Sequence, residues 1–289
     1  GDSTIIAKSS PIQVGALTTW AKIASDTYTS FAIKTNGTLW SWGKNNYGQL
    51  GDSTVYTTDR SSPVQVGALT DWLSLSCNYG NIMALKTNGT LWGWGRNSSG
   101  ALGIGNTTYY SSPKQVGALT TWSKVTTDGN RTLALKTDGT LWGWGINGFG
   151  QIGDGTSVSK SSPVQIGALT TWTAIGKMGA IKGGELWHWG YSVGGRLGAG
   201  GSIAFNFSSP IQVGTQTNWS SLSTSGSPDF ATGIKTDGTL WGWGVSNSYG
   251  QMGIGNTSAY FRVVTQISNL TTWIKTTNQG LACVHLKTV

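Results

Sequence analysis

The sequence is poor in charge, and above all in acidic groups. Of its 289 residues only 11 are Asp or Glu, with Glu185 the single Glu, against 19 Lys and Arg, and charged residues are 10% of the chain. Soluble domains usually carry about one quarter charged residues, and disordered chains carry more charge and fewer aromatics than this one. The composition therefore argues against disorder, and it leaves a net charge of +8.

Strong helix formers and long apolar runs are scarce as well. Gly, Thr, Ser and Trp stand where a helical protein would have Ala, Glu, Lys and Leu. No apolar run approaches the roughly 18 residues of a membrane-spanning helix, and no segment has the charged start and apolar stretch of a secretion signal. We therefore expect neither a long helical protein nor insertion into a membrane.

Trp and Gly are abundant instead, and all 16 Trp follow one period. Six Trp end a Thr-x-Trp segment at intervals of 47 to 54 residues, and ten form five Leu-Trp-x-Trp-Gly pairs. The six leading residues are Trp20, Trp72, Trp122, Trp172, Trp219 and Trp273, and the pairs begin at Trp40, Trp92, Trp142, Trp187 and Trp241. A period of about 50 residues indicates a repeat architecture.

One period predicts four short strands. In the second repeat they are Trp72–Ser76, Ile82–Lys86, Thr90–Trp94 and Pro113–Gly117, with an Asn88-Gly89 hairpin turn between the second and the third. Four antiparallel strands in each period are typical of a propeller blade. We therefore predict an all-β fold, a β-propeller of four-stranded antiparallel blades, with residues 1–289 as a single domain and six repeat periods.

The paired Trp are predicted to be core residues. They lie two apart in the third strand, so both rings lie on one face of the sheet and the small residue between them lies on the other. Large rings against a surface of small residues suit the stacking of one blade on the next. We therefore do not expect the Trp to form a ligand cage.

The two ends share an incomplete period. Gly1-Asp-Ser-Thr4 matches residues 51–54, and His285–Val289 matches the end of a second strand. Together the ends would supply a sixth period that lacks its third strand. We expect the chain to be a processed or incomplete piece of a longer protein, or the missing strand to come from elsewhere, and a longer native chain would have room for seven blades.

Three segments carry a family resemblance. Residues 135–145 (Leu-Lys-Thr-Asp-Gly-Thr-Leu-Trp-Gly-Trp-Gly), 150–154 (Gly-Gln-Ile-Gly-Asp) and 161–165 (Ser-Ser-Pro-Val-Gln) resemble the regulator of chromosome condensation repeat, in its Trp-rich bacterial and phage form. The resemblance covers essentially the whole chain and implies a propeller. It implies no single function, because the family includes nucleotide-exchange factors, an inhibitor of secreted β-lactamases, and surface and virion proteins.

The sequence departs from the family after the first strand. The family's usual Gly-x-x-His is replaced by Asp26-Thr-Tyr-Thr29, Asn78-Tyr-Gly-Asn81 and Asp128-Gly-Asn-Arg131. The exchange-factor role therefore has no support at the level of residues.

The two faces of the predicted disc differ in variability. The turns between strands two and three and between strands four and one recur almost unchanged, and they define the constant face. The connections between strands one and two and between strands three and four differ in length and sequence, and they define the variable face. All nine Tyr map to the variable face, and Tyr is enriched at protein interfaces.

The variable face is the predicted binding surface. Its candidate residues are Tyr28, Tyr56, Tyr79, Tyr109, Tyr110, Arg131, Tyr191, Phe205, Phe207 and Tyr260. An equally weighted alternative is that these Tyr only cover loop backbone. Tyr47 and Tyr249 share one repeat position with Phe149, and a structural role is the alternative for all three.

The constant face carries a predicted ring of six lysines. They are Lys34, Lys86, Lys136, Lys182, Lys235 and Lys287. Such a ring would suit a polyanion such as lipopolysaccharide or an acidic capsid surface, whereas nucleic acid is not the expected partner. Solubility and protection of strand ends are the favoured explanations, because Asp138 and Asp237 follow two of the lysines.

Groups for catalysis or metal binding are few. His188 lies between two Trp of a predicted strand, where a packed structural role is favoured, and His285 lies in a second strand. Cys77 and Cys283 occupy different repeats and strands, so neither a disulfide nor a metal pair is predicted. The sequence has no zinc spacing, nucleophile elbow or phosphate-binding loop, and the Asp and Asn of its Gly-rich turns are better explained by turn formation than by Ca²⁺ binding.

These observations predict a noncatalytic binding protein without cofactor or metal. The leading hypothesis is an extracellular or virion surface protein, for adhesion, decoration or tail association, that binds a protein or a cell-surface glycan within a larger assembly. The alternative is a soluble inhibitor or regulator that binds one partner protein through the variable face. An enzyme is the third and disfavoured class.

Overall fold

The computed structural model of the chain describes residues 1–6, 8–15, 18–54, 58–192, 197–200, 206–224, 230–244, 250, 257, 261–279 and 282–287, with the backbone only at 277–279 and 282–284. Within these ranges the regular elements are 22 β-strands. No helix in the described ranges is long and apolar enough to span a membrane.

The strands recur in one order. First strands are β1 (Trp20–Ser25), β5 (Trp72–Asn78), β9 (Trp122–Thr127), β13 (Trp172–Gly176), β17 (Trp219–Thr224) and β21 (Trp273–Gln279). Second strands are β2 (Thr29–Lys34), β6 (Asn81–Lys86), β10 (Arg131–Lys136), β14 (Gly179–Lys182), β18 (Phe230–Lys235) and β22 (Ala282–Lys287). Third strands are β3 (Leu39–Gly43), β7 (Leu91–Gly95), β11 (Leu141–Gly145), β15 (Glu185–Gly190) and β19 (Leu240–Gly244), and fourth strands are β4 (Arg60–Gln65), β8 (Tyr110–Gln115), β12 (Lys160–Gln165), β16 (Phe207–Gln212) and β20 (Phe261–Ser268).

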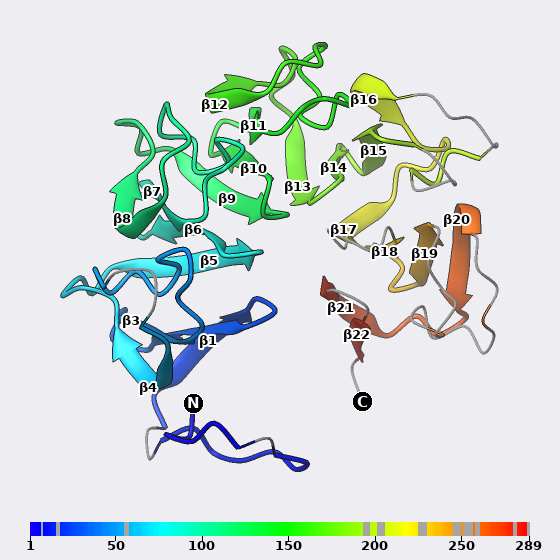
Figure 1. Cartoon of the computed structure of the whole chain (residues 1–289). Coiled ribbons are helices and arrows are strands. Elements are labelled where there is room, and N and C mark those ends of the chain that lie inside the picture. Colours follow the sequence, from blue (N-terminus) through cyan, green and yellow to red (C-terminus); the bar gives the residue numbers. More distant parts are fainter. Residues whose placement is uncertain are drawn as a thin grey trace.

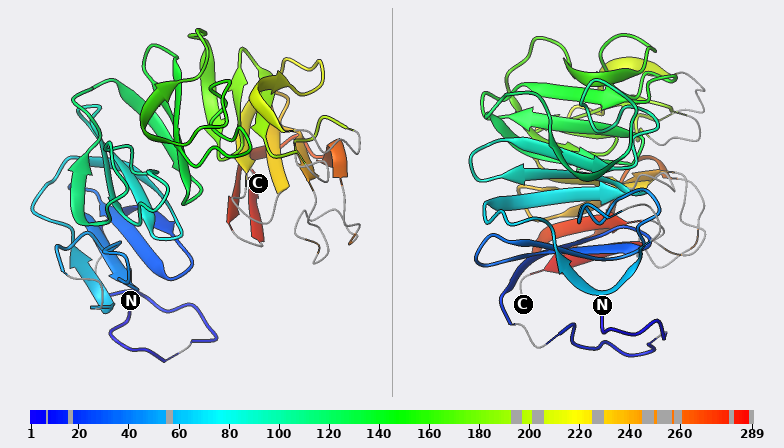
Figure 2. Two further views of the ribbon diagram at one scale, coloured as in Figure 1. Left: turned by 45° about the horizontal axis from the view of Figure 1, so that its top comes forward. Right: turned by 60° about the vertical axis from the view of Figure 1, so that its left-hand side comes forward.

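These strands form five four-stranded antiparallel sheets and one two-stranded sheet, each joined in sequence order. Figure 1 shows the sheets following one another around a centre, with first strands innermost and fourth strands outermost. The views in Figure 2 show them as stacked blades. The predicted propeller of four-stranded blades is confirmed.

Each of the five four-stranded blades has a glycine in its second hairpin turn that the start of the next blade approaches closely. Gly89 has φ +75°, and its carbonyl accepts the N–H of Trp122 at 3.1 Å. A Cβ built on Gly89 would lie 2.1 Å from the carbonyl oxygen of Thr120. The recurrent Asn/Asp-Gly turn therefore both closes the hairpin and starts the next blade.

Gly89→Ala should lower the free energy of unfolding by at least about 3 kcal/mol, because a Cβ would face both a left-handed backbone and the Thr120 carbonyl. Gly117→Ala is the matched control: Gly117 has φ +60°, but no atom lies within 4 Å of its added Cβ. The control should cost only about 1 kcal/mol in urea unfolding. Equal costs would show that the contact with Thr120 is unimportant.

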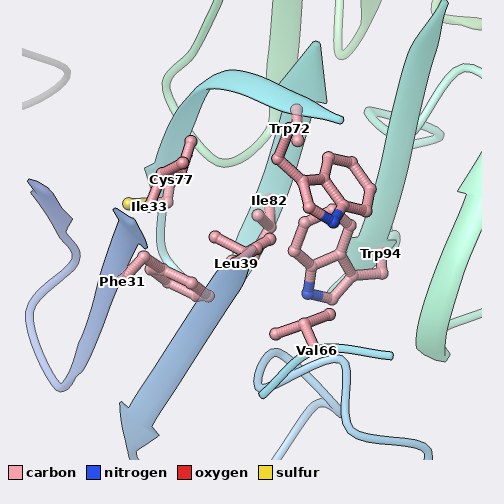
Figure 3. Packing of buried hydrophobic residues seen from close by; sticks show 9 residues of the cluster. Phe31, Ile33, Leu39, Val66, Trp72, Cys77, Ile82 and Trp94 are labelled. Atoms are coloured by element: carbon pink, nitrogen blue, oxygen red, sulfur yellow. The ribbon is translucent and has the colours of Figure 1, made fainter. Parts of the chain in front are cut away.

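The core lies between blades. Phe31, Ile33 and Leu39 of the first blade pack against Trp72 and Ile82 of the second, as Figure 3 shows. The second Trp of each complete pair in blades two to five is at most 1% exposed. In blades two to four the indole N–H of this Trp reaches the preceding blade: Trp94 donates to the Gln49 carbonyl at 2.9 Å, Trp144 to the Ala101 carbonyl at 2.8 Å and Trp189 to the Gln151 carbonyl at 2.9 Å. The assignment of the Trp to the core is confirmed.

Opposite the paired Trp, a small residue faces a large one across the strands. Gly93 pairs with Met83, and Gly143 pairs with Leu133. Blade four reverses the order, because His188 of the third strand pairs with Gly179 of the second. A Cβ on Gly179 would lie 2.3 Å from Cδ2 of His188, so the imidazole takes the space that a second-strand side chain fills elsewhere. The predicted packed role of His188 is confirmed, since its side chain is fully buried against Trp243.

The N-terminal residues repeat the geometry of a third-to-fourth connection. Asp2 accepts the backbone N–H and the hydroxyl of Thr4, as Asp52 does for Thr54. Ser3 and Ser53 have φ of +68° and +65°. The predicted match of residues 1–4 to residues 51–54 is therefore confirmed.

The fourth strand begins earlier than predicted. β8 covers Tyr110–Gln115 rather than Pro113–Gly117. Pro113 is tolerated inside it because the strand lies at the outer edge of its blade, where a missing N–H breaks no ladder bond. Val116 lies beyond the strand yet is buried, and its N–H bonds the Leu91 carbonyl at 2.8 Å.

Candidate functional site

The structure groups the connections between strands in the way that the repeats predict. On the variable face the two kinds of connection are bonded together, since Arg96 N–H donates to the Gly80 carbonyl at 2.8 Å. On the constant face Thr87 N–H, in the hairpin turn, donates to the Asp71 carbonyl before the first strand at 2.9 Å. On each face of blade two, a backbone hydrogen bond therefore joins the two connections that meet there.

Two Tyr project most from the variable face. Tyr28 is 68% exposed and Tyr79 is 51% exposed. Tyr109, Tyr110, Tyr191 and Phe207 are half-buried. Three predicted binding residues, Tyr56, Phe205 and Tyr260, lie outside the described residues, as does Tyr249.

Tyr79 is held in an unusual backbone conformation. Its φ is +47°, which is rare for a residue with a Cβ other than Asn or Asp. Its N–H donates to Oδ1 of Asp26 at 2.9 Å, and Gly80 N–H donates to Oδ2 of the same carboxylate at 2.5 Å. On the other side, a Cβ on Gly129 would lie 2.8 Å from Cβ of Tyr79. Blades one and three thus fix the turn of blade two that presents Tyr79.

Tyr47, Arg96 and Tyr109 lie together beside the turn that carries Tyr79, and we call these four residues the Tyr79 cluster. The ring of Tyr47 covers Gly80, where a Cβ would lie 2.7 Å from Cδ2 of the ring. Tyr47 meets Tyr109 edge to face with centroids 5.8 Å apart, and the Arg96 guanidinium lies 5.9 Å from the Tyr47 centroid. The cluster joins blades one and two across the variable face.

A second cation on this face was missed by sequence reasoning. The Lys44 amine lies 4.9 Å from the centroid of Tyr28. Lys44 and Arg96 occupy one repeat position directly after the third strand, together with Ile146. That shared position, next to the Tyr-bearing connections, is the signal that could have found them.

The prediction that Arg131 is a binding residue of the variable face is wrong, because its side chain is buried. It is only 5% exposed, and its Nε bonds Asp128 at 2.7 Å. Its guanidinium also donates to the carbonyls of Gln151 and Lys177. The short first connection of blade four brings the Lys177 carbonyl within reach, so Arg131 ties two blades together instead of facing a partner.

Tyr110 also has structural contacts. It packs against the buried clusters on both sides of its blade, and its hydroxyl accepts from Asn106 Nδ2 at 3.1 Å. Phe207 packs against the buried cluster between blades three and four. Tyr191 lies against Phe149, with ring centroids 5.1 Å apart. Their binding role stays a prediction. The described contacts on this face join Lys44 to Tyr28, and Arg96 and Tyr109 to Tyr47.

The lysines of the constant face lie over Trp rings. The amine of Lys136 is 3.7 Å from the Trp142 centroid, and that of Lys235 is 3.6 Å from the Trp241 centroid. Lys34, Lys86 and Lys182 show the same contact at 3.8, 4.4 and 4.2 Å with Trp40, Trp92 and Trp187. Lys287 is exposed.

This stacking gives the lysines a structural role. Lys86 and Lys235 are each 5% exposed, and Lys86 also pairs with Asp71 at 3.3 Å. Burial lowers the pKa of Lys235, against the opposing charge of Asp237. Binding of a polyanion by the ring stays a prediction, and the cation contacts with Trp favour the structural explanation.

Lys136→Gln should lower the free energy of unfolding by about 1 kcal/mol, because it removes the cation from the faces of Trp122 and Trp142. Lys136→Arg keeps a cation there and should stay close to wild type. Chemical denaturation of both variants checks the contact. A loss of the same size in Lys136→Arg would argue against a cation contact as the cause.

The described residues hold few groups suited to catalysis. They contain no cluster of three or more His, Cys, Asp or Glu side chains that would hold a metal ion. Cys77 is a buried free thiol, and burial raises its pKa well above the ordinary range. Burial, with a contribution from the charge of Arg131, lowers the pKa of His188 to about 3. A thiol that stays protonated is a poor nucleophile, and an imidazole with a pKa of about 3 is a weak base at neutral pH.

The comparisons with known proteins agree with this architecture. The chain is 34% identical to the RCC2 homolog of Xenopus laevis over 79 residues, which are 27% of this chain and 15% of that protein. It is 34% identical to the ultraviolet-B receptor UVR8 of Arabidopsis thaliana over 80 residues, which are 27% of this chain and 18% of that protein. The matches thus span less than a fifth of these relatives' length.

Solved structures match over most of the chain. Human WBSCR16 superposes with a TM-score of 0.80 and 20% identity, over 93% of this chain and 72% of that one. Prp20p of Saccharomyces cerevisiae superposes with a TM-score of 0.78 and 19% identity, over 93% and 69%. At such identities the likeness shows the fold alone.

Family models of the regulator of chromosome condensation (RCC1) repeat match the chain directly. One matches residues 36–85, 88–135 and 138–176, and a second matches 21–49 and 72–101. Together they cover more than half of the sequence, in the segments that form blades one to four. The chain therefore belongs to the regulator of chromosome condensation (RCC1) repeat family.

Proposed function

We propose that the chain is a noncatalytic binding protein that recognises a protein partner through the variable face, with Tyr79 at the centre of the contact. The observation that carries the proposal is the strained and exposed position of Tyr79. Gly or Asn would suit its φ of +47° better, yet the position holds a large, half-exposed aromatic side chain. Strain of this kind is kept where the side chain has a function, and Tyr is a common anchor of interfaces.

The charges of this face support a partner surface with acidic groups. The carboxylate of Asp26 accepts hydrogen bonds from the backbone N–H groups of Tyr79 and Gly80, and Asp128 forms an ion pair with Arg131. Among the described residues Lys44 and Arg96 have no carboxylate within 4 Å, and both lie over exposed Tyr rings. A partner that brings carboxylates to these two cations would complement the surface in charge.

Protein binding by a neighbour of the same fold supports this choice. The yeast protein Prp20p is described with binding properties to Gsp1p and histones, and in a complex with Kap60. Those partners belong to Prp20p, and this chain lacks the family's Gly-x-x-His in the repeats considered above. We therefore propose the class of ligand, a protein, and not the identity of the partner.

The setting that we propose is an extracellular or virion surface, and the alternative is a soluble inhibitor or regulator of one enzyme. An experiment that separates them captures ligands on immobilised chain from extracts and particle fractions of the organism that makes it. Retention on cells or particles supports the surface role, and a discrete soluble complex with one protein supports the alternative. Capture that a glycosidase abolishes and a protease does not would contradict the protein partner.

A further inference from the structure

The turns that lead from a fourth strand into the next first strand project from the constant face. The structure describes five of these turns completely, and four of them carry a Leu that is 44 to 48% exposed. A Cβ built on Gly67, Gly117 or Gly167, two residues before the Leu, would meet no atom within 4 Å, so these turns face open space. We call the four side chains the Leu ring: Leu69, Leu119, Leu169 and Leu270.

The Leu ring lies at one level of the disc. After each of the five turns, the first-strand Trp donates its N–H to a hairpin glycine of the preceding blade at 2.9 to 3.2 Å. Before four of the turns, a buried Val or Ile donates its N–H to the third strand of its own blade at 2.8 Å, as Val66 does to Leu39. Blades of a propeller are related by rotation about one axis, so turns with the same bonds place their side chains at the same height.

The fold does not require Leu in these turns. The turn before blade five has Gln216 in place of Leu, yet Val213 N–H still bonds the Leu186 carbonyl at 2.8 Å. Gly214 of this turn has φ +69°, close to the +62° of Gly67. Single exposed Leu residues are ordinary on protein surfaces, whereas several at one level form an apolar face that can meet a partner. The recurrence of the exposed Leu therefore points to a contact outside the chain.

The constant face also carries an excess of positive charge. Lys22 belongs to this face, because its amine donates to the Leu73 carbonyl at the start of the next first strand at 2.6 Å, and Lys124 makes the same contact one blade further from its own strand. Lysines outnumber acidic groups here by nine to four among the described residues: Lys22, Lys34, Lys86, Lys124, Lys136, Lys182, Lys235, Lys275 and Lys287, against Asp71, Asp138, Glu185 and Asp237.

Four of these lysines are available to a partner. They are exposed, and in the described part of the chain none of them has a carboxylate within 4 Å: Lys22, Lys124, Lys275 and Lys287. Lys86 and Lys182 are instead paired with Asp71 at 3.3 Å and Glu185 at 3.2 Å. The available lysines are therefore distinct from those that have a structural role beside the Trp rings.

We propose that the constant face binds peripherally to an anionic lipid bilayer, with the Leu ring at the headgroup boundary and the exposed lysines at the lipid phosphates. A bilayer is flat, and it offers an apolar layer directly beneath negative charge, which matches Leu side chains at one level beside lysines. Nucleic acid matches less well, because the described residues of this face include no Arg and its Trp rings are covered by lysine amines. The variable face lies on the opposite side of the disc, so this contact is independent of the function proposed above.

Sedimentation of the whole chain with lipid vesicles tests the proposal without any variant. Vesicles of phosphatidylcholine with about 30% phosphatidylglycerol should bind the chain about tenfold or more tightly than vesicles of phosphatidylcholine alone, because exposed lysines are attracted to the anionic surface. Binding should weaken as NaCl rises from about 0.1 to about 0.5 M, since salt screens this attraction. No binding, or equal binding to the two kinds of vesicle, would overturn the proposal.

A variant of the Leu ring separates lipid from other polyanions. Replacement of all four Leu by Gln copies the natural Gln216 and should keep the fold, and it should weaken binding to the anionic vesicles about tenfold or more. The control is Ile146→Gln/Val158→Gln, which removes two exposed apolar side chains from the variable face and should leave vesicle binding unchanged. Vesicle binding by the Leu ring variant equal to that of wild type would overturn the proposal, as would wild-type binding to duplex DNA at least as tight as to the vesicles.

Discussion

The wild-type protein should lose stability as the pH falls from 6.5 to 4.5, and His188→Leu should abolish most of this loss. The imidazole is fully buried, and burial lowers its pKa from an ordinary value of 6.5 to about 3. The unfolded chain therefore binds a proton in this window that the folded chain does not bind. Folding becomes less favourable by about 1.4 kcal/mol for each pH unit below 6.5, or about 2 kcal/mol at pH 5.

The same substitution should do no harm at pH 7.5. Neither ring nitrogen of His188 has a hydrogen-bond partner in the described part of the structure. Replacing a buried polar group without partners by an apolar one of similar size is close to neutral or stabilising. Leu fits the space because Gly179 opposite leaves it open, as Gly143 does for Leu133.

Urea unfolding at pH 7.5, 6.0 and 5.0 checks this prediction. The wild-type chain should lose stability across the series, and His188→Leu should lose much less. His285→Gln is the control. Burial also lowers the pKa of His285, but this side chain is only partly buried, so we expect it to contribute less to the pH dependence than His188 does. Asp2, Asp138 and Asp237 have pKa values lowered by hydrogen bonds and contribute below about pH 4. An unchanged pH slope in His188→Leu would contradict the account of this residue.

Tyr79→Asn should raise the free energy of unfolding by about 0.5 to 1 kcal/mol while it weakens binding. Asn tolerates φ near +50° better than Tyr does, and the amide bonds from residues 79 and 80 to Asp26 do not depend on the side chain. A residue that is retained at a cost in stability, and whose loss costs affinity, has a functional role.

Thermal and urea unfolding of Tyr79→Asn measure the first half of the prediction. Tyr28→Asn is the matched control, because Tyr28 is also exposed but has no positive φ. It should not gain stability. A clear loss of stability in Tyr79→Asn would mean that the ring holds the loop together, which was the alternative weighed for the Tyr of this face.

The repeat made most of the fold predictable. The spacing of the Trp located every blade, because each Trp has one role that recurs in each period. The start of β8 was misplaced because Pro113 marks a strand boundary in most sequences, and only the outer position of this strand in its blade makes it acceptable.

The sequence predicted which face of the disc carries the candidate site, but not which residues form it. Variation among the repeats located the variable face, but Arg131 was counted on it although it is buried. Its burial depends on a deletion some 46 residues later, which brings the Lys177 carbonyl to its guanidinium. The positive φ of Tyr79 likewise depends on Asp26 of one blade and Gly129 of another. Contacts between blades of this kind leave no local pattern in the sequence.

The affinity of a captured partner for variants of the two faces tests the central claim most directly. Calorimetric titration would compare wild type, Tyr28→Ala/Tyr79→Asn on the variable face, and Lys136→Gln on the constant face. The account predicts that the double variant weakens Kd about 30-fold or more, which is about 2 kcal/mol, and that Lys136→Gln changes it less than about twofold. An unchanged Kd in the folded double variant, or a loss confined to Lys136→Gln, would contradict it.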